Sequence, residues 1–242
     1  MQIIKNILYL SILLLTSCSP KLQIHSIKQN SIEVKSEPDS NILSIISPYQ
    51  IGIDSVMNEI LCINNTVMKK GRPESLLGNF VADLCLNQIS NQADICVLNM
   101  GGLRTVLPIG EITKGKIYEL MPFENELVIL ELEIKSFIEL LDHITMKNEP
   151  FSGIEIIKSH KGYHINNIND DVETYFKINK KQYIKVLTTD YLANIGEKMS
   201  FFQNKEQIKV GIKLRDAIIN YCMKQDTIAV KIDNRIKIIE NE

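Results

Sequence analysis

A helix-like segment followed by a short apolar run constrains the fold of this chain more than any other part of the sequence. Ser75 is a candidate N-cap, and seven apolar side chains follow it at helical spacing: Leu76, Leu77, Phe80, Val81, Leu84, Cys85 and Ile89. Residues 93–98 then form a short apolar run that ends at the sequence Asn99-Met100-Gly101-Gly102, which predicts a buried strand leading into a tight loop. We therefore expect a helix that buries one face on a sheet.

The rest of the chain divides into predicted helices and a run of predicted strands. The periodicity predicts helices over residues 54–61, 135–143 and 215–223, strands over residues 127–133, 154–158, 163–168, 174–178 and 183–187, and extended segments over residues 227–239. Because helices and runs of strands segregate along the sequence, we expect an α+β fold with a mixed β-sheet packed with helices. A chain of 242 residues accommodates one substantial domain, which we place at residues 47–242.

The N-terminal segment has the layout of an export signal. Lys5 precedes an apolar run over residues 7–15, which is too short to span a bilayer as a helix of about 20 residues. The run ends in Leu15-Thr16-Ser17-Cys18, which resembles a bacterial lipobox with Cys18 as the lipidated residue. We predict a signal peptide over residues 1–17, a lipidated tether over residues 18–46 and a lipid anchor in the bacterial cell envelope, facing the periplasm or the surface. The alternative is a plain signal peptide with an incidental cysteine.

Charge and cysteine usage exclude two classes of protein. The 27 Lys and Arg residues nearly balance the 29 Asp and Glu residues, so the chain lacks the basic excess that binding to a nucleic acid polymer requires. Five cysteines in 242 residues are too few for a disulfide scaffold. The four cysteines beyond Cys18 form no CxxC pair and have apolar neighbours, which predicts buried free thiols, with a single disulfide as the open alternative: Cys62, Cys85, Cys96 and Cys222.

No pattern in the sequence is typical of a catalytic metal site or of an activated nucleophile. The four histidines form no HExxH motif, and His160 and His164 flank Gly162 in a segment that is better interpreted as a solvated hairpin than as a metal pair. No GxSxG motif or phosphate-binding GxxxxGK[ST] loop is present. We therefore predict no metal ligand and no catalytic residue in this chain.

The loop after the predicted strand over residues 93–98 is the strongest candidate for a binding site. Gly101 and Gly102 allow a sharp turn and a close approach of the backbone to a ligand. Arg104, two residues later, supplies a planar guanidinium that suits a phosphate or a carboxylate. The pattern thus indicates an anion site, and the alternative is an ordinary turn.

Five segments of the sequence, in order, resemble the C-terminal domain of 5′-nucleotidases. They are GNFVAD over residues 78–83, LNMGGLR over 98–104, GEIT over 110–113, MPFENELV over 121–128 and TDYLANIGE over 189–197. The resemblance covers the chain from about Ser47 onwards. It implies the α+β fold of that domain and a site that binds a nucleotide.

The resemblance implies a set of base-binding residues. Phe123 and Tyr191 resemble the pair of aromatic residues that sandwich the base, and Asn125 matches the residue that hydrogen-bonds it. Stacking between a base and an aromatic ring is worth about 1–3 kcal/mol and tolerates any base. The alternative for both aromatic residues is packing in the core.

The resemblance also implies contacts to the phosphate and the ribose. Asn99, Gly102 and Arg104 resemble the family loop that contacts both groups, and Arg72 corresponds to an upstream arginine that binds the phosphate. Glu197 stands where the family usually has an aspartate that binds the ribose hydroxyls. The loop before it also departs from the family sequence Asn-Gly-Gly-Asp, because Ile195 replaces the first glycine.

In the family, this domain presents the phosphate of its nucleotide to a separate metallophosphatase domain. Between Cys18 and Pro48 we see no room for such a domain, which needs about 100 residues. We therefore expect the nucleotide-binding half of a split 5′-nucleotidase, inactive without a separately encoded metallophosphatase that carries the divalent metal. One alternative is a membrane-tethered nucleotide or nucleoside receptor without hydrolytic activity. A third possibility, to which the departures at Ile195 and Glu197 point, is a degenerate domain retained for protein contacts.

Overall fold

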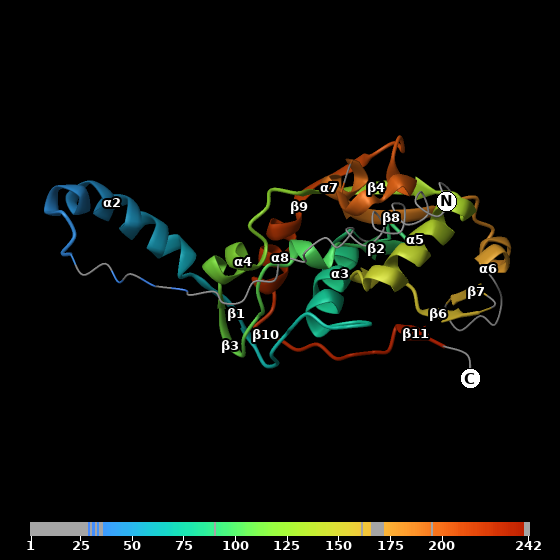
Figure 1. Cartoon of the computed structure of the whole chain (residues 1–242), viewed down its shortest axis with the longest axis horizontal. Coiled ribbons are helices and arrows are strands. Elements are labelled where there is room, and N and C mark those ends of the chain that lie inside the picture. Colours follow the sequence, from blue (N-terminus) through green and yellow to red (C-terminus); the bar gives the residue numbers. More distant parts are fainter. Residues whose placement is uncertain are drawn as a thin grey trace, which may run out of the picture. The chain divides into compact units, whose positions relative to one another are not determined.

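The structure is a computed structural model that describes residues 29, 31, 33, 36–89, 91–160, 162–165, 172–194 and 196–239. The chain divides into two units, residues 1–44 and 45–242, and the second unit contains every described strand (Figure 1). The predicted signal peptide over residues 1–17 and the predicted lipidation site Cys18 lie outside the described residues. No helix in the described part of the chain is long and apolar enough to cross a bilayer.

A five-stranded mixed sheet is the centre of the second unit. Its strands follow the order β5-β2-β8-β4-β9, and β2 is parallel to β8 while the other neighbours are antiparallel. All three residues of β2 are buried, as expected of a strand that is covered on both faces. The strands are β2 (Ile95–Val97), β4 (Glu126–Leu132), β5 (Phe151–Ser152), β8 (Ile184–Thr189) and β9 (Ile208–Lys213).

Helices cover both faces of this sheet, because successive strand residues point to opposite sides. Leu127 and Ile129 of β4 belong to one apolar cluster with residues of α3, α4 and α8. Val128 and Leu130 belong to a second cluster with residues of α5 and α6. The α+β class with a mixed sheet packed with helices is therefore confirmed. The helices are α3 (Leu76–Gln88), α4 (Lys114–Leu120), α5 (Ile134–Lys147), α6 (Val172–Ile178) and α8 (Leu214–Cys222).

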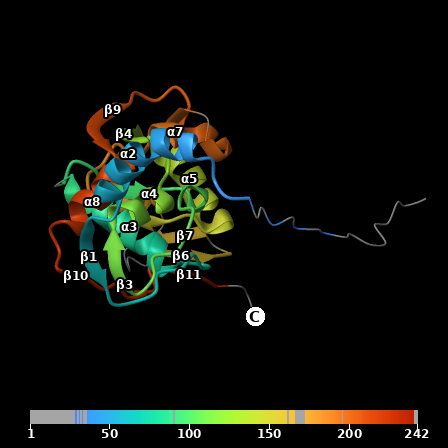
Figure 2. The ribbon, with the colours of Figure 1, turned by 90° about the vertical axis from the view of Figure 1, so that its left-hand side faces the viewer.

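Two smaller sheets complete the described strands. Strands β10, β1 and β3 form one of them and lie side by side in Figure 2. Strands β11, β6 and β7 form the other, in which β6 and β7 make the predicted hairpin that contains His160 and His164. The strands are β1 (Ile60–Asn64), β3 (Gly110–Thr113), β6 (Ile156–Ser159), β7 (Gly162–Ile165), β10 (Thr227–Ile228) and β11 (Ile236–Ile238).

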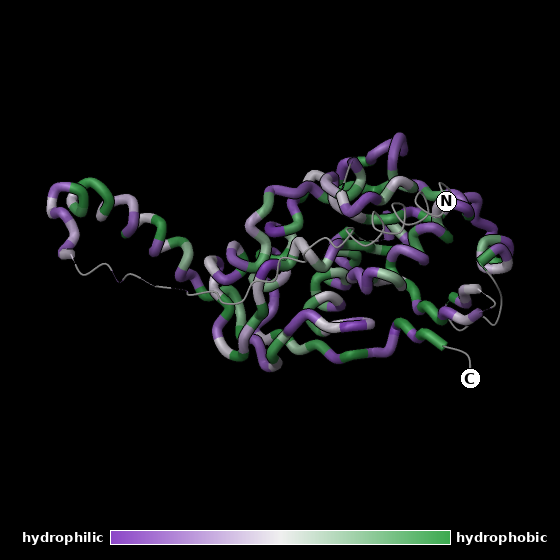
Figure 3. The backbone as a smooth tube through the Cα atoms, in the orientation of Figure 1, coloured by the Kyte–Doolittle hydropathy of each residue, from purple (hydrophilic) through white to green (hydrophobic). Residues whose placement is uncertain are grey.

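Helix α2 (Ser40–Met57) contains no buried residue. Apolar segments of this helix are green in Figure 3, and its exposed large apolar side chains are Ile42, Leu43, Ile45, Ile46, Tyr49, Ile51, Ile53 and Val56. The helix ends at Met57, so the predicted helix over residues 54–61 is wrong beyond that residue. Ile60 and Leu61, at the end of that predicted helix, lie instead in β1, and the Leu61 side chain is buried in the apolar cluster that contains residues of α3, α4 and α8.

The predicted strand over residues 174–178 is also wrong, since these residues belong to helix α6. The segment VETYFKI contains β-branched and aromatic residues that favour a strand, but its apolar positions also fit a helix. Val172, Tyr175 and Phe176 are buried at helical spacing, and the Phe176 ring packs against Phe137 of α5 with 5.9 Å between ring centroids. Tertiary packing therefore decides the conformation of a short segment whose pattern is ambiguous.

The other predicted helices and strands overlap elements of the structure, and residues 166–168 of the predicted strand over residues 163–168 lie outside the described residues. The predicted N-cap is present at the start of α3, where the Ser75 hydroxyl accepts a hydrogen bond from the Gly78 N–H at 3.0 Å. Four described cysteines are free and buried, as predicted: Cys62, Cys85, Cys96 and Cys222.

Candidate functional site

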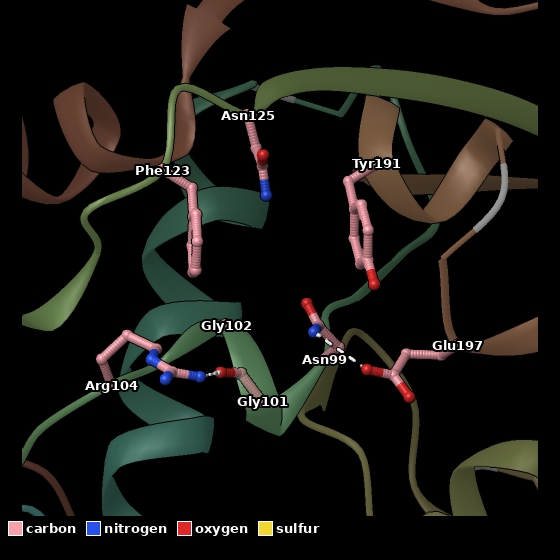
Figure 4. Close-up of a pocket in the computed structure, with 8 residues that line it drawn as sticks. All are labelled: Asn99, Gly101, Gly102, Arg104, Phe123, Asn125, Tyr191 and Glu197. Atoms are coloured by element: carbon pink, nitrogen blue, oxygen red, sulfur yellow. Dashed lines mark hydrogen bonds between the residues drawn. The ribbon is translucent and has the colours of Figure 1, made fainter.

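The loop after β2 forms the floor of a cavity (Figure 4). Residues Met100–Gly102 make a 3-10 turn, in which the Gly102 N–H donates to the Asn99 carbonyl at 3.1 Å. A Cβ atom at Gly102 would lie only 3.0 Å from Asn99 Oδ1, so glycine leaves the Asn99 side chain its space. Arg104 Nη1 donates to the Gly101 carbonyl at 3.3 Å, which holds the guanidinium beside the turn.

Helix α3 packs against the loop that forms this floor. Gly78 lies in its first turn, and a Cβ atom there would lie 3.2 Å from Cε of Met100 and 2.9 Å from the Ser75 hydroxyl. The small residue therefore lets the helix approach the turn closely. This contact gives a structural reason for the glycine in the segment over residues 78–83.

Two aromatic rings form the walls of the cavity. Phe123 precedes β4, and Tyr191 lies in α7 (Asp190–Asn194). Figure 4 shows the two rings on opposite sides of the open space, with the Asn125 amide between them at one end and Asn99 at the other. Phe123 is 41% exposed and Tyr191 is 47% exposed, so neither ring packs in the core. Exposed rings that face one another leave room for a flat ligand between them.

Charged groups hold the loop that carries Phe123 and Asn125. The Glu124 carboxylate, between these two residues, bonds to both Lys213 and Arg215. The two bonds lower the pKa of Glu124 to about 2, and the bond with Lys213 has the larger effect. The Arg215 guanidinium also lies over the Tyr118 ring, 4.1 Å from its centroid. The loop is thereby tied to the start of α8 and to α4.

Asp190 connects the two walls at their bases. Its Oδ1 atom accepts the Tyr191 N–H at 2.8 Å and the Glu126 N–H at 3.1 Å. Gly196 lies against the other side of the tyrosine, since a Cβ atom there would lie 2.6 Å from Cε1 of Tyr191. The Asp190 carboxylate thus holds the backbone of Tyr191, and the lack of a side chain at Gly196 leaves space for the Tyr191 ring.

Glu197 is at the opposite edge of the floor from Arg104 (Figure 4). Its backbone has φ 54° and ψ 19°, in the left-handed region that is uncommon for a residue with a side chain. Its Oε1 atom accepts a hydrogen bond from Asn99 Nδ2 at 3.5 Å. The preceding Ile195, where the sequence departs from the family pattern, lies outside the described residues.

Seven of the eight predicted binding residues line this one cavity of about 260 Å³. Arg72 lies instead in a neighbouring hollow beside Lys70, Lys147 and Met100. Gly101 lines the cavity without having been predicted as a contact, although the Gly-Gly sequence signalled it. The lining residues are Asn99, Gly101, Gly102, Arg104, Phe123, Asn125, Tyr191 and Glu197.

Sequence reasoning missed the residues that hold the lining residues in place. Asp190 and Gly196 lie inside a segment that was recognised, but neither was assigned a role there. Glu124 was likewise part of a recognised segment, and only the distant partners Lys213 and Arg215 indicate its role.

Comparison with known proteins identifies a matching family, relatives in sequence and similar solved structures. The family model described as 5′-nucleotidase, C-terminal domain matches residues 52–204. An apyrase from Tabanus yao is 24% identical over 213 residues, which cover 76% of this chain and 38% of the apyrase. The crystal structure of a 5′-nucleotidase precursor from Thermus thermophilus has a TM-score of 0.64 at 20% identity, over 85% of this chain and 44% of that one. A Haemophilus influenzae NAD nucleotidase structure has a TM-score of 0.61 at 17% identity, over 83% of this chain and 41% of that one. The chain therefore spans less than half the length of these proteins, and at these identities the two structures establish a shared fold.

Proposed function

The chain belongs to the family of 5′-nucleotidase C-terminal domains, and on that premise we propose that its cavity binds a (deoxy)ribonucleotide. The observation that carries the proposal is the pair of half-exposed rings, Phe123 and Tyr191, on opposite sides of a cavity of about 260 Å³. A base stacked between them gains about 1–3 kcal/mol per ring contact whatever its identity. The Asn125 amide, between the rings at one end, is then in position to hydrogen-bond the edge of the base.

The floor supplies groups suited to the rest of the nucleotide. The Arg104 guanidinium offers a planar pair of donors for a phosphate, and the glycines beside it leave the backbone accessible. Glu197 offers a carboxylate that can accept hydrogen bonds from ribose hydroxyls. In this arrangement the base lies between the walls, and the sugar and phosphate lie over the floor. Arg72, in the neighbouring hollow, is assigned to the phosphate by resemblance alone.

We further propose that the bound phosphate is presented to a metallophosphatase on a separate polypeptide, for hydrolysis to nucleoside and phosphate. The cavity itself does not fit a metal ion, because its lining contains a guanidinium, two amides, two rings and the single carboxylate of Glu197. Among the described residues, no three His, Cys, Asp or Glu side chains gather in a way that could hold a metal. The proposal therefore assigns the divalent metal to the partner, and this chain contributes binding and orientation of the substrate.

The proposed site of action is the bacterial cell envelope. This part of the proposal rests on the apolar run over residues 7–15 and on the lipobox-like sequence that ends at Cys18. Several acyl chains on Cys18 would anchor the chain stably, since each buried CH₂ contributes about 0.8 kcal/mol. Metabolic labelling with a radioactive fatty acid tests it, because label should enter the wild-type chain and be absent from Cys18→Ser.

Calorimetric titration with AMP and adenosine tests nucleotide binding. We expect saturable binding of AMP, weakened between about fivefold and about a hundredfold in Tyr191→Ala, because one stacking contact is lost. Tyr191→Phe keeps the ring and should bind nearly as the wild type does. Tyr183→Ala removes a tyrosine of similar exposure, 40%, outside the cavity and is the matched control. Absence of binding at millimolar AMP would contradict the proposal and favour the degenerate domain.

Reconstitution tests the split enzyme. A metallophosphatase exported to the same compartment should hydrolyse AMP with a divalent metal only when this chain is added, and Arg104→Ala should reduce the rate. If the mixture is inert although AMP binds, the chain is better described as a membrane-tethered nucleotide-binding protein without hydrolytic activity.

A further inference from the structure

A buried carboxylate lies directly behind the floor of the cavity. Glu149 follows the C-terminus of α5 and is only 7% exposed. Its Oε2 atom accepts a hydrogen bond from the Met100 N–H at 2.6 Å, and its Oε1 atom lies 4.0 Å from Nε2 of His143. Glu149 is absent from the lining of the cavity, so it contacts the floor from the protein side.

Burial of a carboxylate costs free energy unless hydrogen bonds compensate it, so the partners of a buried carboxylate indicate what the residue does. Met100 is the first residue of the 3-10 turn, and the N–H groups at the start of such a turn have no partner within it. A carboxylate that accepts one of them forms a short, charge-assisted hydrogen bond. The 2.6 Å bond therefore fixes the end of the turn at which Asn99 enters the cavity.

We propose that Glu149 is a positioning residue for the nucleotide site, holding the Met100–Gly102 turn through the Met100 N–H. The inference rests on the proposed function, because it concerns the same cavity. Three groups of the floor depend on that turn: the Asn99 side chain, the Gly101 carbonyl that holds Arg104, and the Gly102 backbone. Release of the Met100 N–H lets these groups shift, and binding of the phosphate weakens although the aromatic walls are untouched.

The surroundings of Glu149 make this role dependent on pH. The pKa of Glu149 lies above its ordinary value, and burial is the largest cause. The Met100 N–H acts against this shift, the Glu197 carboxylate adds to it, and Lys147 acts against it. His143 does not supply a compensating charge at neutral pH, because burial and then Lys147 lower its pKa. Lys70 and Arg72, the other charged groups nearby, line the hollow on the far side of Met100. Protonation of Glu149 leaves a carbonyl acceptor but removes the charge from the bond to Met100, so the affinity for AMP should fall as the pH is lowered, by no more than the difference between Glu149→Gln and the wild type at neutral pH.

Two substitutions of Glu149 separate positioning from simple packing. Glu149→Ala leaves the Met100 N–H without its acceptor, and we expect about a tenfold loss of AMP affinity, since a lost charge-assisted bond has that effect. Glu149→Gln retains a carbonyl acceptor of the same shape, so its affinity at neutral pH should stay within about threefold of the wild type. It cannot be protonated, so it should lose the part of the acid dependence that the wild type owes to Glu149. Glu139→Gln changes an exposed carboxylate of the preceding helix α5 and is the matched control.

Calorimetry with AMP from pH 5 to pH 8 on the full chain provides the readout, together with thermal unfolding of each variant. The loss in Glu149→Ala should shrink when Arg104 is already replaced by Ala, because both act on the same floor. Equal AMP affinity and equal pH profiles in wild type, Glu149→Ala and Glu149→Gln would overturn this inference and leave the proposed function intact. If Glu149→Ala does not fold, the pH profile of Glu149→Gln against the wild type decides alone. If the wild type itself binds no AMP, both proposals fail.

Discussion

The floor and the walls of the cavity are built in different ways. The floor is a 3-10 turn backed by helix α3 and by a buried carboxylate, and its Asn99 is only 9% exposed. The walls are two aromatic residues that are each more than 40% exposed; Asp190 and Glu124 hold the backbone that carries them, and Gly196 lies against the Tyr191 ring. A ring that stacks on a ligand has to leave its face open, so its position must be set by its backbone. A floor has no such requirement and can share the packing of the core. Substitutions in the floor should therefore affect folding and binding together, whereas those in the walls should affect mainly binding.

Gly78→Ala has the largest expected effect on stability. The added Cβ would lie 2.9 Å from the Ser75 hydroxyl and 3.2 Å from Met100 Cε, so the N-cap hydroxyl of α3 must shift and the Met100 side chain must give way. We expect the free energy of unfolding to fall by about 1–2 kcal/mol and the AMP affinity to fall with it. Urea unfolding and calorimetry measure the two effects.

Gly52→Ala is the control for that substitution. No atom lies within 4 Å of a Cβ at Gly52, which is in helix α2, so stability should stay unchanged or rise slightly. If Gly78→Ala lowered AMP affinity without lowering stability, the floor would not share the packing of the core and the comparison would break.

Gly196→Ala has a smaller expected effect, which falls on the wall. The added Cβ would lie 2.6 Å from Cε1 and 2.8 Å from Cδ1 of Tyr191, so the ring must leave its present position. We expect AMP affinity to fall by up to about tenfold, no more than the loss of the stacking contact itself. The loss should shrink in the Tyr191→Ala background, because the contact with the ring is already gone, and what remains should come from the 2.9 Å approach of the Cβ to the carbonyl oxygen of residue 191. Full additivity in calorimetry would show that Gly196 acts through something other than the ring.

The residues that line the cavity could be predicted from the sequence, whereas most of their supports could not. Local pattern indicated the tight loop at Gly101 and Gly102, and resemblance added Phe123 and Tyr191 as a pair. Nothing near Met100 in the sequence indicates that its N–H is held by Glu149, 49 residues later. Such bonds depend on how strands and helices pack, and a single sequence carries no direct signal of that packing.

The errors in the predicted secondary structure have the same physical origin. Residues 172–178 fit either a helix or a strand by their pattern, and packing of Phe176 against Phe137 selects the helix. Ile60 and Leu61 end the helix predicted from Asp54, but they belong to β1, which pairs with β3 and β10. Elements whose apolar pattern matched one periodicity only, such as α3 and α5, were predicted correctly.

Glu124→Gln has the smallest expected effect and tests whether surface charges hold a wall. Lys213, and then Arg215, keep the pKa of Glu124 at about 2, below its ordinary value of 4.5. A lowered pKa in the folded state means that this carboxylate stabilises the fold fully above about pH 4.5 and that the contribution is lost as pH falls towards 2. The difference in free energy of unfolding between wild type and Glu124→Gln should therefore be small and constant from pH 7 to about pH 5. Below about pH 5 this difference should decrease progressively as the pH falls. Chemical unfolding across this range measures it, and Glu111→Gln, at another exposed carboxylate, is the control.

Because Glu124 lies between Phe123 and Asn125, AMP affinity should also fall, but by less than in Gly196→Ala. A difference in stability that stays constant down to pH 2 would mean that the ion pairs do not anchor the loop, and the Phe123 wall would then depend on packing as the floor does.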